Sequence, residues 1–154
     1  MIFLNCIEGY DVKKLQLFDT FQSVIHETIR FMDQNPDHYS VSIRITNNKE
    51  IQDINHLYRD INMPTDILSF AAGEFDPESG LTHLGDLVIS YEKVMQQALE
   101  AGHSLSVEFA LLAVHGSLHL YGFDHATKDD KREMWQKQSQ ILANLSILPK
   151  NLPE

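Results

Sequence analysis

The sequence predicts an α+β fold: a single domain in which helices flank a small mixed β-sheet and a buried central helix binds a metal. Short apolar or alternating segments of strand length recur along the chain, with longer segments of helical periodicity between them. The chain has 154 residues, 43% of them hydrophobic, which is enough for one substantial core. No repeat or low-complexity segment interrupts residues 1–154, so we expect one domain.

The N-terminal half is predicted to contain a strand over residues 2–7, a helix over 12–32 and a strand over 39–46. Pro36 separates this helix from the strand that follows, because proline interrupts helical structure. Asn47 is a favourable N-cap for a further helix that runs to about Asp60.

The C-terminal half starts with a turn-rich segment over residues 62–66. We predict a strand over 67–71, a surface loop over 73–80, a strand over 84–90, a helix over 90–100, a helix over 104–121 and a final helix capped by Thr127. Gly102 can end the helix before it, since glycine tolerates the left-handed conformation after a helix. One side of the final helix, which Pro149 follows, carries Met134, Gln138, Ile141 or Leu142, and Leu145.

The helix over 104–121 should be buried, because apolar residues cover most of its circumference. A stripe of small residues on this helix suits close packing against a sheet or another helix: Ser106, Ala110, Ala113 and Ser117. Glu108 lies about 10 Å before His115 along the helix axis. We therefore expect Glu108 to line a cleft rather than to bind a metal.

Three histidines at positions i, i+4 and i+10 predict a metal site: His115, His119 and His125. Four helical residues rise about 6 Å and turn about 400°, so the first two project from one face. Gly122 can reverse the chain and bring His125 over that face. Histidines can also cluster by chance, but this spacing with a glycine at the bend favours one Zn²⁺ per chain, with a fourth position open for water. Other divalent transition metals could compete for imidazole ligands.

The motif lacks the glutamate on which zinc peptidases depend. In the pattern His-Glu-x-x-His-x-x-Gly-x-x-His that glutamate is the general base, whereas this chain has Gly116 there. A reaction that takes its base from elsewhere is therefore favoured over peptide hydrolysis.

The segment from His115 to His125 resembles the signature of the bacterial YbeY endoribonucleases, His-Gly-x-Leu-His-Leu-x-Gly-Tyr-Asp-His, with Phe123 in place of the usual tyrosine. Two upstream segments are also similar to signatures of this family: Leu57-Tyr58-Arg59 together with residues 64–70, and residues 84–90. Asn62-Met63 stands where the family usually has an acidic-basic pair.

This resemblance implies a single-strand-specific, metal-dependent endoribonuclease that matures the 3′ end of small-subunit (16S) ribosomal RNA and acts in ribosome quality control. It implies RNA and the small ribosomal subunit with its associated factors as partners, the three histidines as metal ligands, and Arg59 as a catalytic residue. A guanidinium can grip a phosphate through two parallel hydrogen bonds and stabilise charge on a developing phosphorane. From spacing alone, Arg59 would be a solvated residue at the flank of a helix.

Composition limits the cellular setting. Cys6 is the only cysteine, which excludes disulfides within the chain and thiolate zinc sites and suits a reducing cytoplasm. No apolar run approaches the roughly 20 residues of a membrane span, so we expect no membrane partner. The net charge of −10 opposes indiscriminate RNA binding. Basic residues that could still form a patch are Lys13, Lys14, Arg44, Lys128, Lys131 and Arg132.

Asp66, Asp86 and Asp124 are candidates to line the cleft or to hold a ligand histidine, and each could equally be a turn or cap residue. His83 is a better candidate than His56 for a fourth imidazole near the metal. We expect RNA strand cleavage in which the metal polarises the phosphate or activates water. Two alternatives remain: a zinc-dependent amidase or peptidase with the same ligands, and a ribosome-associated protein with structural zinc.

Overall fold

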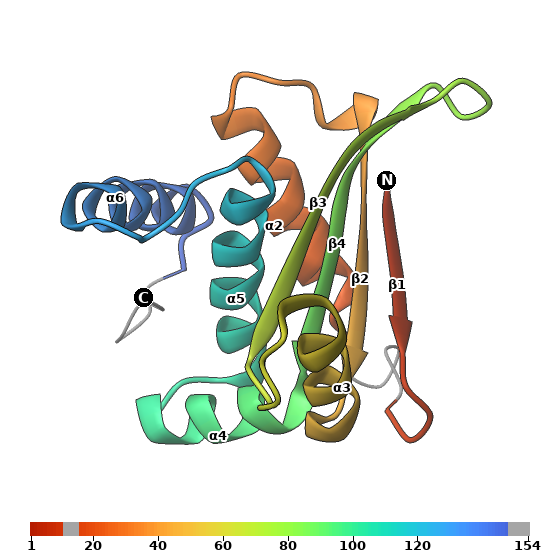
Figure 1. Cartoon of the computed structure of the whole chain (residues 1–154). Coiled ribbons are helices and arrows are strands. Elements are labelled where there is room, and N and C mark those ends of the chain that lie inside the picture. Colours follow the sequence, from red (N-terminus) through yellow and green to blue (C-terminus); the bar gives the residue numbers. More distant parts are fainter. Residues whose placement is uncertain (11–15, 148–154) are drawn as a thin grey trace.

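The computed structural model describes residues 1–10 and 16–147 (Figure 1). The predicted helix start at residues 12–15, Lys13, Lys14 and Pro149 fall outside this range. Within it, the chain forms β1 (Ile2–Cys6), α2 (Phe18–Phe31), a 3₁₀ turn (Pro36–His38), β2 (Tyr39–Thr46), α3 (Asn48–Arg59), β3 (Ile67–Asp76), β4 (Leu81–Ser90), α4 (Tyr91–Ala101), α5 (Leu105–Leu120) and α6 (Lys128–Asn144).

The four strands form one mixed sheet in the order β1-β2-β4-β3. The pairs β1–β2 and β2–β4 are parallel, and β3 pairs with β4 in the antiparallel direction. A parallel pair needs a crossover connection, and α2 lies in the crossover between β1 and β2. The predicted α+β fold with a small mixed sheet is therefore confirmed.

The predicted surface loop over residues 73–80 is wrong for its first half. Strand β3 continues to Asp76 and pairs with β4 up to the register Asp76–Leu81, so the two strands form a long hairpin. The pairing register shifts between Ala71 and Glu74, where Gly73 has a φ of 71°. Because the outer part of β3 is polar and exposed, no apolar alternation identifies it as a strand.

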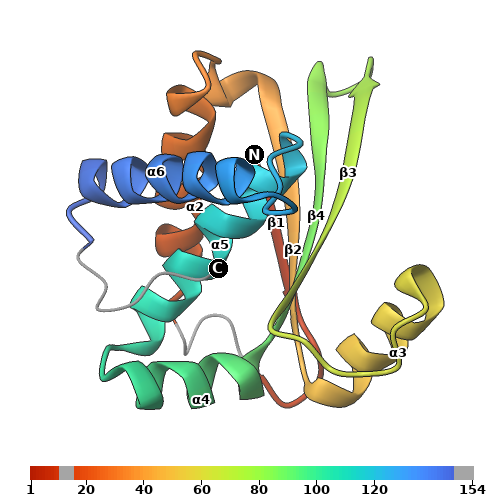
Figure 2. The ribbon, with the colours of Figure 1, turned by 60° about the vertical axis from the view of Figure 1, so that its left-hand side comes forward.

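Helices cover both faces of the sheet, and α5 lies in the thicker layer (Figures 1 and 2). The main core joins Leu87 and Ile89 of β4 to the apolar residues of α2 and α5. Val88, between them in sequence, belongs to a second cluster with Ile51 of α3 and Leu68 of β3. Since alternate residues of a strand face opposite sides, α3 covers the other face of the sheet. The start of the small-residue stripe of α5 faces α2, where the Ser106 and Thr20 hydroxyls lie 3.2 Å apart.

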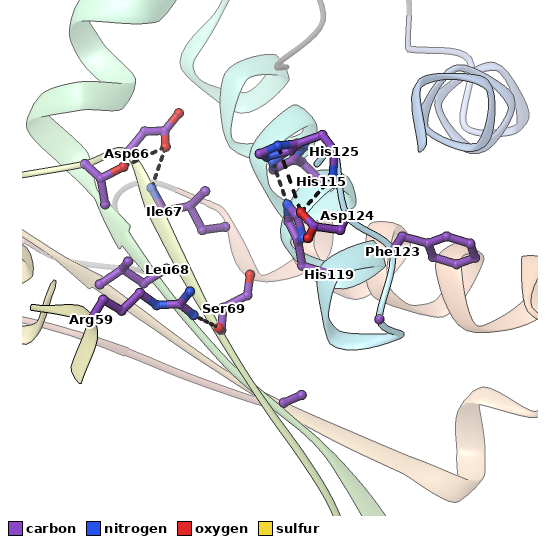
Figure 3. Close-up of a pocket in the computed structure, with 13 residues that line it drawn as sticks. Arg59, Asp66, Ile67, Leu68, Ser69, His115, His119, Phe123, Asp124 and His125 are labelled. Carbon is purple, nitrogen blue, oxygen red and sulfur yellow. Dashed lines mark hydrogen bonds and ion pairs between the residues drawn. The ribbon is translucent and has the colours of Figure 1, made fainter. Parts of the chain in front are cut away.

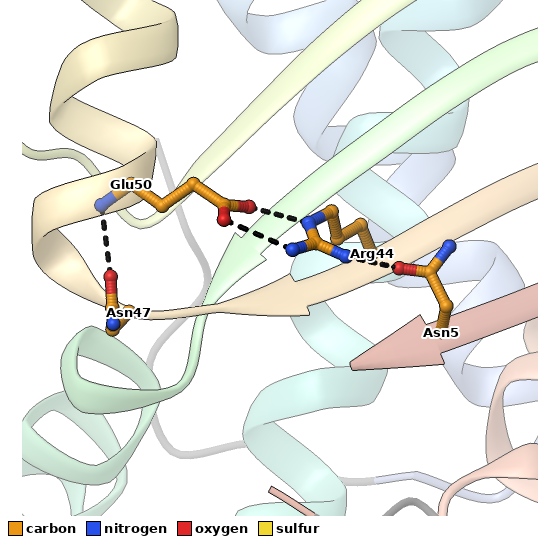
Figure 4. Close-up of polar contacts among 4 residues, drawn as sticks. All are labelled: Asn5, Arg44, Asn47 and Glu50. Carbon is orange, nitrogen blue, oxygen red and sulfur yellow. Dashed lines mark hydrogen bonds and ion pairs between the residues drawn. The ribbon is translucent and has the colours of Figure 1, made fainter. Parts of the chain in front are cut away.

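An ion pair anchors α3 to the sheet (Figure 4). The guanidinium of Arg44 on β2 pairs with Glu50, donating to its Oε2 at 3.0 Å, and donates to Asn5 Oδ1 on β1 at 2.6 Å. The predicted cap is confirmed, because Asn47 Oδ1 accepts from the Glu50 backbone N–H at 2.9 Å. The charge of Arg44 is thus balanced by Glu50, which weakens the case for Arg44 in an RNA-binding patch.

Candidate metal centre

The three predicted histidine ligands lie together at the C-terminal end of α5 (Figure 3). Each of His115, His119 and His125 offers one ring nitrogen, and these nitrogens all lie within 4.8 Å of one another. The Nε2 atoms of His115 and His119 are 3.1 Å apart, as expected for residues one helical turn apart. In the part of the chain that the structure describes, the cluster could hold a metal ion.

A hydrogen-bonded reversal delivers the third histidine. The backbone N–H of Phe123 donates to Leu118 O at 3.1 Å, and the N–H of Gly122 donates to His119 O at 2.9 Å. These two bonds are those of the Schellman motif, which requires a left-handed residue after the helix. Gly122 supplies it with a φ of 93°. The sequence-based prediction for this glycine is therefore confirmed.

Burial keeps two of the imidazoles neutral at neutral pH. Burial, together with the neighbouring His119, lowers the pKa of His115 to about 4, although a hydrogen bond with Gln138 opposes the shift. Burial also lowers the pKa of His119, against an opposing backbone hydrogen bond with Phe123. A metal binds the neutral form of imidazole, so this environment favours ligation over protonation.

The histidines open into a cleft of about 660 Å³. Its walls are the segment from Thr65 to Ser69 with Ala71, the end of α5, and the turn from Gly122 to His125. Arg59 also lines the cleft, although α3 lies on the opposite face of the sheet. Its guanidinium reaches the edge strand β3, where Nη2 donates to Ser69 O at 2.6 Å and the carbon Cζ lies 5.3 Å from the centre of the Phe70 ring.

Two of the three predicted aspartates line the cleft. Asp66 accepts hydrogen bonds from the Ile67 N–H at 2.7 Å and from Gln97 Nε2 at 3.2 Å, so its carboxylate is held in place. Asp124 accepts from the His125 backbone N–H at 2.7 Å, and its Oδ1 lies 4.0 Å from the His125 ring nitrogen Nδ1. Asp124 is thus the carboxylate next to the histidine cluster, whereas Asp66 lies beside Ile67 on the other side of the cleft (Figure 3).

The structure places Asp86 and Glu108 elsewhere. Asp86 pairs with His83 at 3.0 Å, and neither residue is among those that line the cleft in the described part of the chain. Glu108 is buried and pairs with His103 at 2.5 Å, so the expectation that Glu108 lines the cleft is wrong. The reason is that the first turns of α5 are buried against other helices rather than open to the cleft.

Packing explains the missing glutamate of the peptidase motif. A Cβ atom at Gly116 would lie 2.6 Å from Ile67 Cδ1 and 3.0 Å from Leu87 Cδ2. Gly116 O also accepts a hydrogen bond from the Ser69 hydroxyl at 3.1 Å. This face of α5 lies directly against β3 and β4, so the position has no room for the side chain of a general base.

One polar residue of the site was not predicted as such. Gln138 was grouped with the apolar side of the final helix, and it is indeed buried there. Its Oε1 atom, however, lies 2.6 Å from Nδ1 of His115. The only sequence signal was a glutamine among apolar positions of α6.

Comparison with known proteins identifies the family of this chain. The family model "Endoribonuclease YbeY" matches residues 5–146. The chain belongs to the YbeY endoribonuclease family. Curated relatives named Endoribonuclease YbeY include one from Bacillus licheniformis, 46% identical over 69% of this chain and 72% of that protein. Another, from Thermoanaerobacter pseudethanolicus, is 35% identical over 88% of this chain and 92% of its own length.

A solved structure supports the same fold. The solution structure of TM1509 from Thermotoga maritima aligns with a TM-score of 0.58 at 24% identity, covering 97% of this chain and 95% of that one. The family model and the curated relatives confirm the resemblance inferred from the YbeY sequence motifs. Membership of an endoribonuclease family makes this chain a nuclease by class, and the substrate of that class is RNA. None of the helices among the described residues has the length and apolar character needed to cross a membrane.

Proposed function

We propose that this YbeY-family chain is a zinc-dependent endoribonuclease of the cytoplasm that cuts single-stranded RNA. In this proposal it matures the 3′ end of 16S ribosomal RNA and acts in ribosome quality control together with the small ribosomal subunit. The observation that carries the proposal is that a three-histidine cluster and Arg59, which come from opposite faces of the sheet, line one cleft.

The donor set suits one zinc ion. Two imidazole nitrogens that each lie about 2.0–2.1 Å from a tetrahedral zinc are about 3.3 Å from each other. The His115 and His119 Nε2 atoms, at 3.1 Å, are close to that separation without rearrangement. Zinc held by His115, His119 and His125 would supply Lewis acidity toward a phosphate oxygen or a bound water.

Arg59 would bind the scissile phosphate. Its guanidinium is held at the cleft by one N–H bond to Ser69 O and by the face of Phe70. A guanidinium has five N–H donors in a planar fork, so further donors remain for two parallel bonds to a phosphate. Positive charge in this position would stabilise the charge that develops during phosphoryl transfer.

The acidic surface fits an enzyme that depends on recruitment. A net charge of −10 repels RNA at long range, and Arg44 does not relieve it because Glu50 balances its charge. Among the described residues that line the cleft, Arg59 is the only lysine or arginine, so the positive charge there would come from the metal and Arg59. Such a protein would cleave free RNA weakly and would gain access to its substrate on the small ribosomal subunit.

The test is cleavage of single-stranded ribosomal RNA by wild type, Arg59→Ala and a control variant, with zinc content measured on all three. Arg30→Ala is the matched control, because Arg30 is an exposed helix residue with an i−3 ion pair to Glu27 and no place in the cleft. We expect equal zinc content in all three proteins and loss of cleavage, by about 100-fold or more, in Arg59→Ala alone. Zinc-loaded wild type that leaves RNA intact, alone and with small ribosomal subunits, would contradict the proposal.

Two further measurements separate the alternatives. An amidase or peptidase would have to take its base from Asp66 or Asp124, because Gly116 has no space for one. Turnover of a peptide substrate that His119→Ala abolishes would favour that activity. A protein with structural zinc would instead lose folding stability on chelation and show no turnover of RNA or peptide.

A further inference from the structure

Gln138 joins the final helix to the metal site. It lies on α6 and is only 1% exposed, among the buried apolar residues Met134, Ile141 and Leu142. A glutamine amide buried in such a stripe costs free energy unless hydrogen bonds compensate for its lost water. One of its bonds is to His115, at 2.6 Å between Oε1 and Nδ1.

This bond determines which nitrogen of His115 carries the proton. An amide oxygen can only accept, so Nδ1 of His115 must be the donor. The Nε2 atom of the neutral ring then has an unprotonated lone pair, and Nε2 is the nitrogen that faces His119. The bond to Gln138 therefore directs the lone pair of His115 toward the histidine cluster.

We propose that Gln138 is a positioning residue that holds His115 in the Nδ1–H tautomer and thereby prepares Nε2 for metal ligation. The relevance of this role to catalysis rests on the proposed zinc centre. The hydrogen bond itself is a property of the metal-free protein and can be tested there. The role also gives α6, which supplies no histidine to the cluster, a function in the site.

The first measurement is the tautomer of His115 in the metal-free protein, from long-range ¹H–¹⁵N correlation spectra of protein labelled at histidine. We expect the Nδ1–H form in wild type. Gln138→Met, similar in size but without the acceptor, should lose the single tautomer, whereas Gln138→Glu keeps an acceptor oxygen and should retain it. Gln136→Met changes an exposed glutamine of the same helix and should match wild type.

The second measurement is zinc affinity, by competition with a chromogenic chelator. Loss of a hydrogen bond that orients a metal-bound histidine typically weakens binding by roughly 10- to 100-fold. We expect that loss in Gln138→Met and near wild-type affinity in Gln138→Glu and Gln136→Met. Equal weakening in Gln138→Met and Gln138→Glu would show that packing rather than the acceptor matters, and would overturn the inference.

The inference also fails if His115 of wild type is the Nε2–H tautomer, or if Gln138→Met leaves tautomer and affinity unchanged. If Gln138→Met does not fold, the tautomer of His115 measured in wild type and in Gln138→Glu still tests the inference, because both proteins should have the Nδ1–H form. Failure of the proposed function has a different signature. Wild type that binds no zinc contradicts the zinc centre whatever the tautomer, whereas wild type that binds zinc and cuts RNA with no effect of Gln138 contradicts only this inference.

Discussion

Gly116→Ala tests whether close packing of α5 on the sheet sets the geometry of the metal centre. In an exposed helix this substitution stabilises by about 1 kcal/mol, because alanine has the higher helix propensity. Here the new Cβ would lie 2.6 Å from Ile67 Cδ1, 3.0 Å from Leu87 Cδ2 and 3.1 Å from Ser69 Oγ. Overpacking of a core costs about 1–3 kcal/mol. We therefore expect a net loss of about 1 kcal/mol in the free energy of unfolding.

A second-site change makes this prediction sharper. Ile67→Val removes the Cδ1 atom that the new methyl group would meet first, at a cost of about 1 kcal/mol when made alone. If that contact is responsible, the double variant Gly116→Ala/Ile67→Val should be about 1 kcal/mol more stable than the sum of the single effects predicts. Urea unfolding of wild type, both single variants and the double variant measures this coupling.

Two results would refute the packing argument. One is a Gly116→Ala variant that is about 1 kcal/mol more stable than wild type, as on an exposed helix. The other is strict additivity of the two substitutions. The zinc affinity of the same variants tests whether this packing affects the metal site. Any shift of α5 away from β3 would displace His115 and His119 together, because both lie on α5.

Three further predictions concern the supports of the site. Burial holds the pKa of His115 at about 4, below its unfolded value of 6.5. As the pH falls from 6.5 to about 4, the unfolded chain therefore takes up a proton first, and the free energy of unfolding of the metal-free protein should decrease by about 3 kcal/mol. Urea unfolding of wild type and of His115→Gln over this pH range measures the contribution of His115. Gly122→Ala should cost about 1–2 kcal/mol and weaken zinc binding, because φ is 93° there, whereas Gly122→Asn should be milder; thermal unfolding and zinc titration test both. Asn47→Ala should lower the free energy of unfolding by about 1 kcal/mol, because it removes the cap of α3, and should leave zinc affinity unchanged. A loss of zinc affinity as large as that in Gly122→Ala would contradict the view that the cap does not support the metal site.

Local signals explain what the sequence predicted well. The helix expected over residues 104–121 is observed as Leu105–Leu120, since Ser104 caps its start and Gly122 reverses the chain after its end. Both signals depend on neighbouring residues only. The spacing of the three histidines within the same segment therefore sufficed to predict their proximity.

The missed features depend on contacts between distant segments. The outer part of β3 is polar, and only pairing with β4 makes it a strand. Gln138 lies 23 residues after His115, and its place in an apolar stripe resembled a core position. Arg59 can reach the cleft because β3 is the edge strand of the sheet. No local sequence pattern predicts which strand lies at the edge.

The proposed site combines rigidly held histidines with a less constrained arginine, for which we propose phosphate binding. His115 and His119 project from a helix that is buried over most of its length, where local unfolding is least favourable. Arg59 instead extends from the exposed end of α3, and its guanidinium donates to a backbone oxygen at the sheet edge. A metal centre gains affinity from ligands already in place, whereas a group that binds successive phosphates must exchange partners. Because Ser69 O takes only one of the five guanidinium N–H groups, the proposed contact of Arg59 with RNA would not require it to give up this anchor.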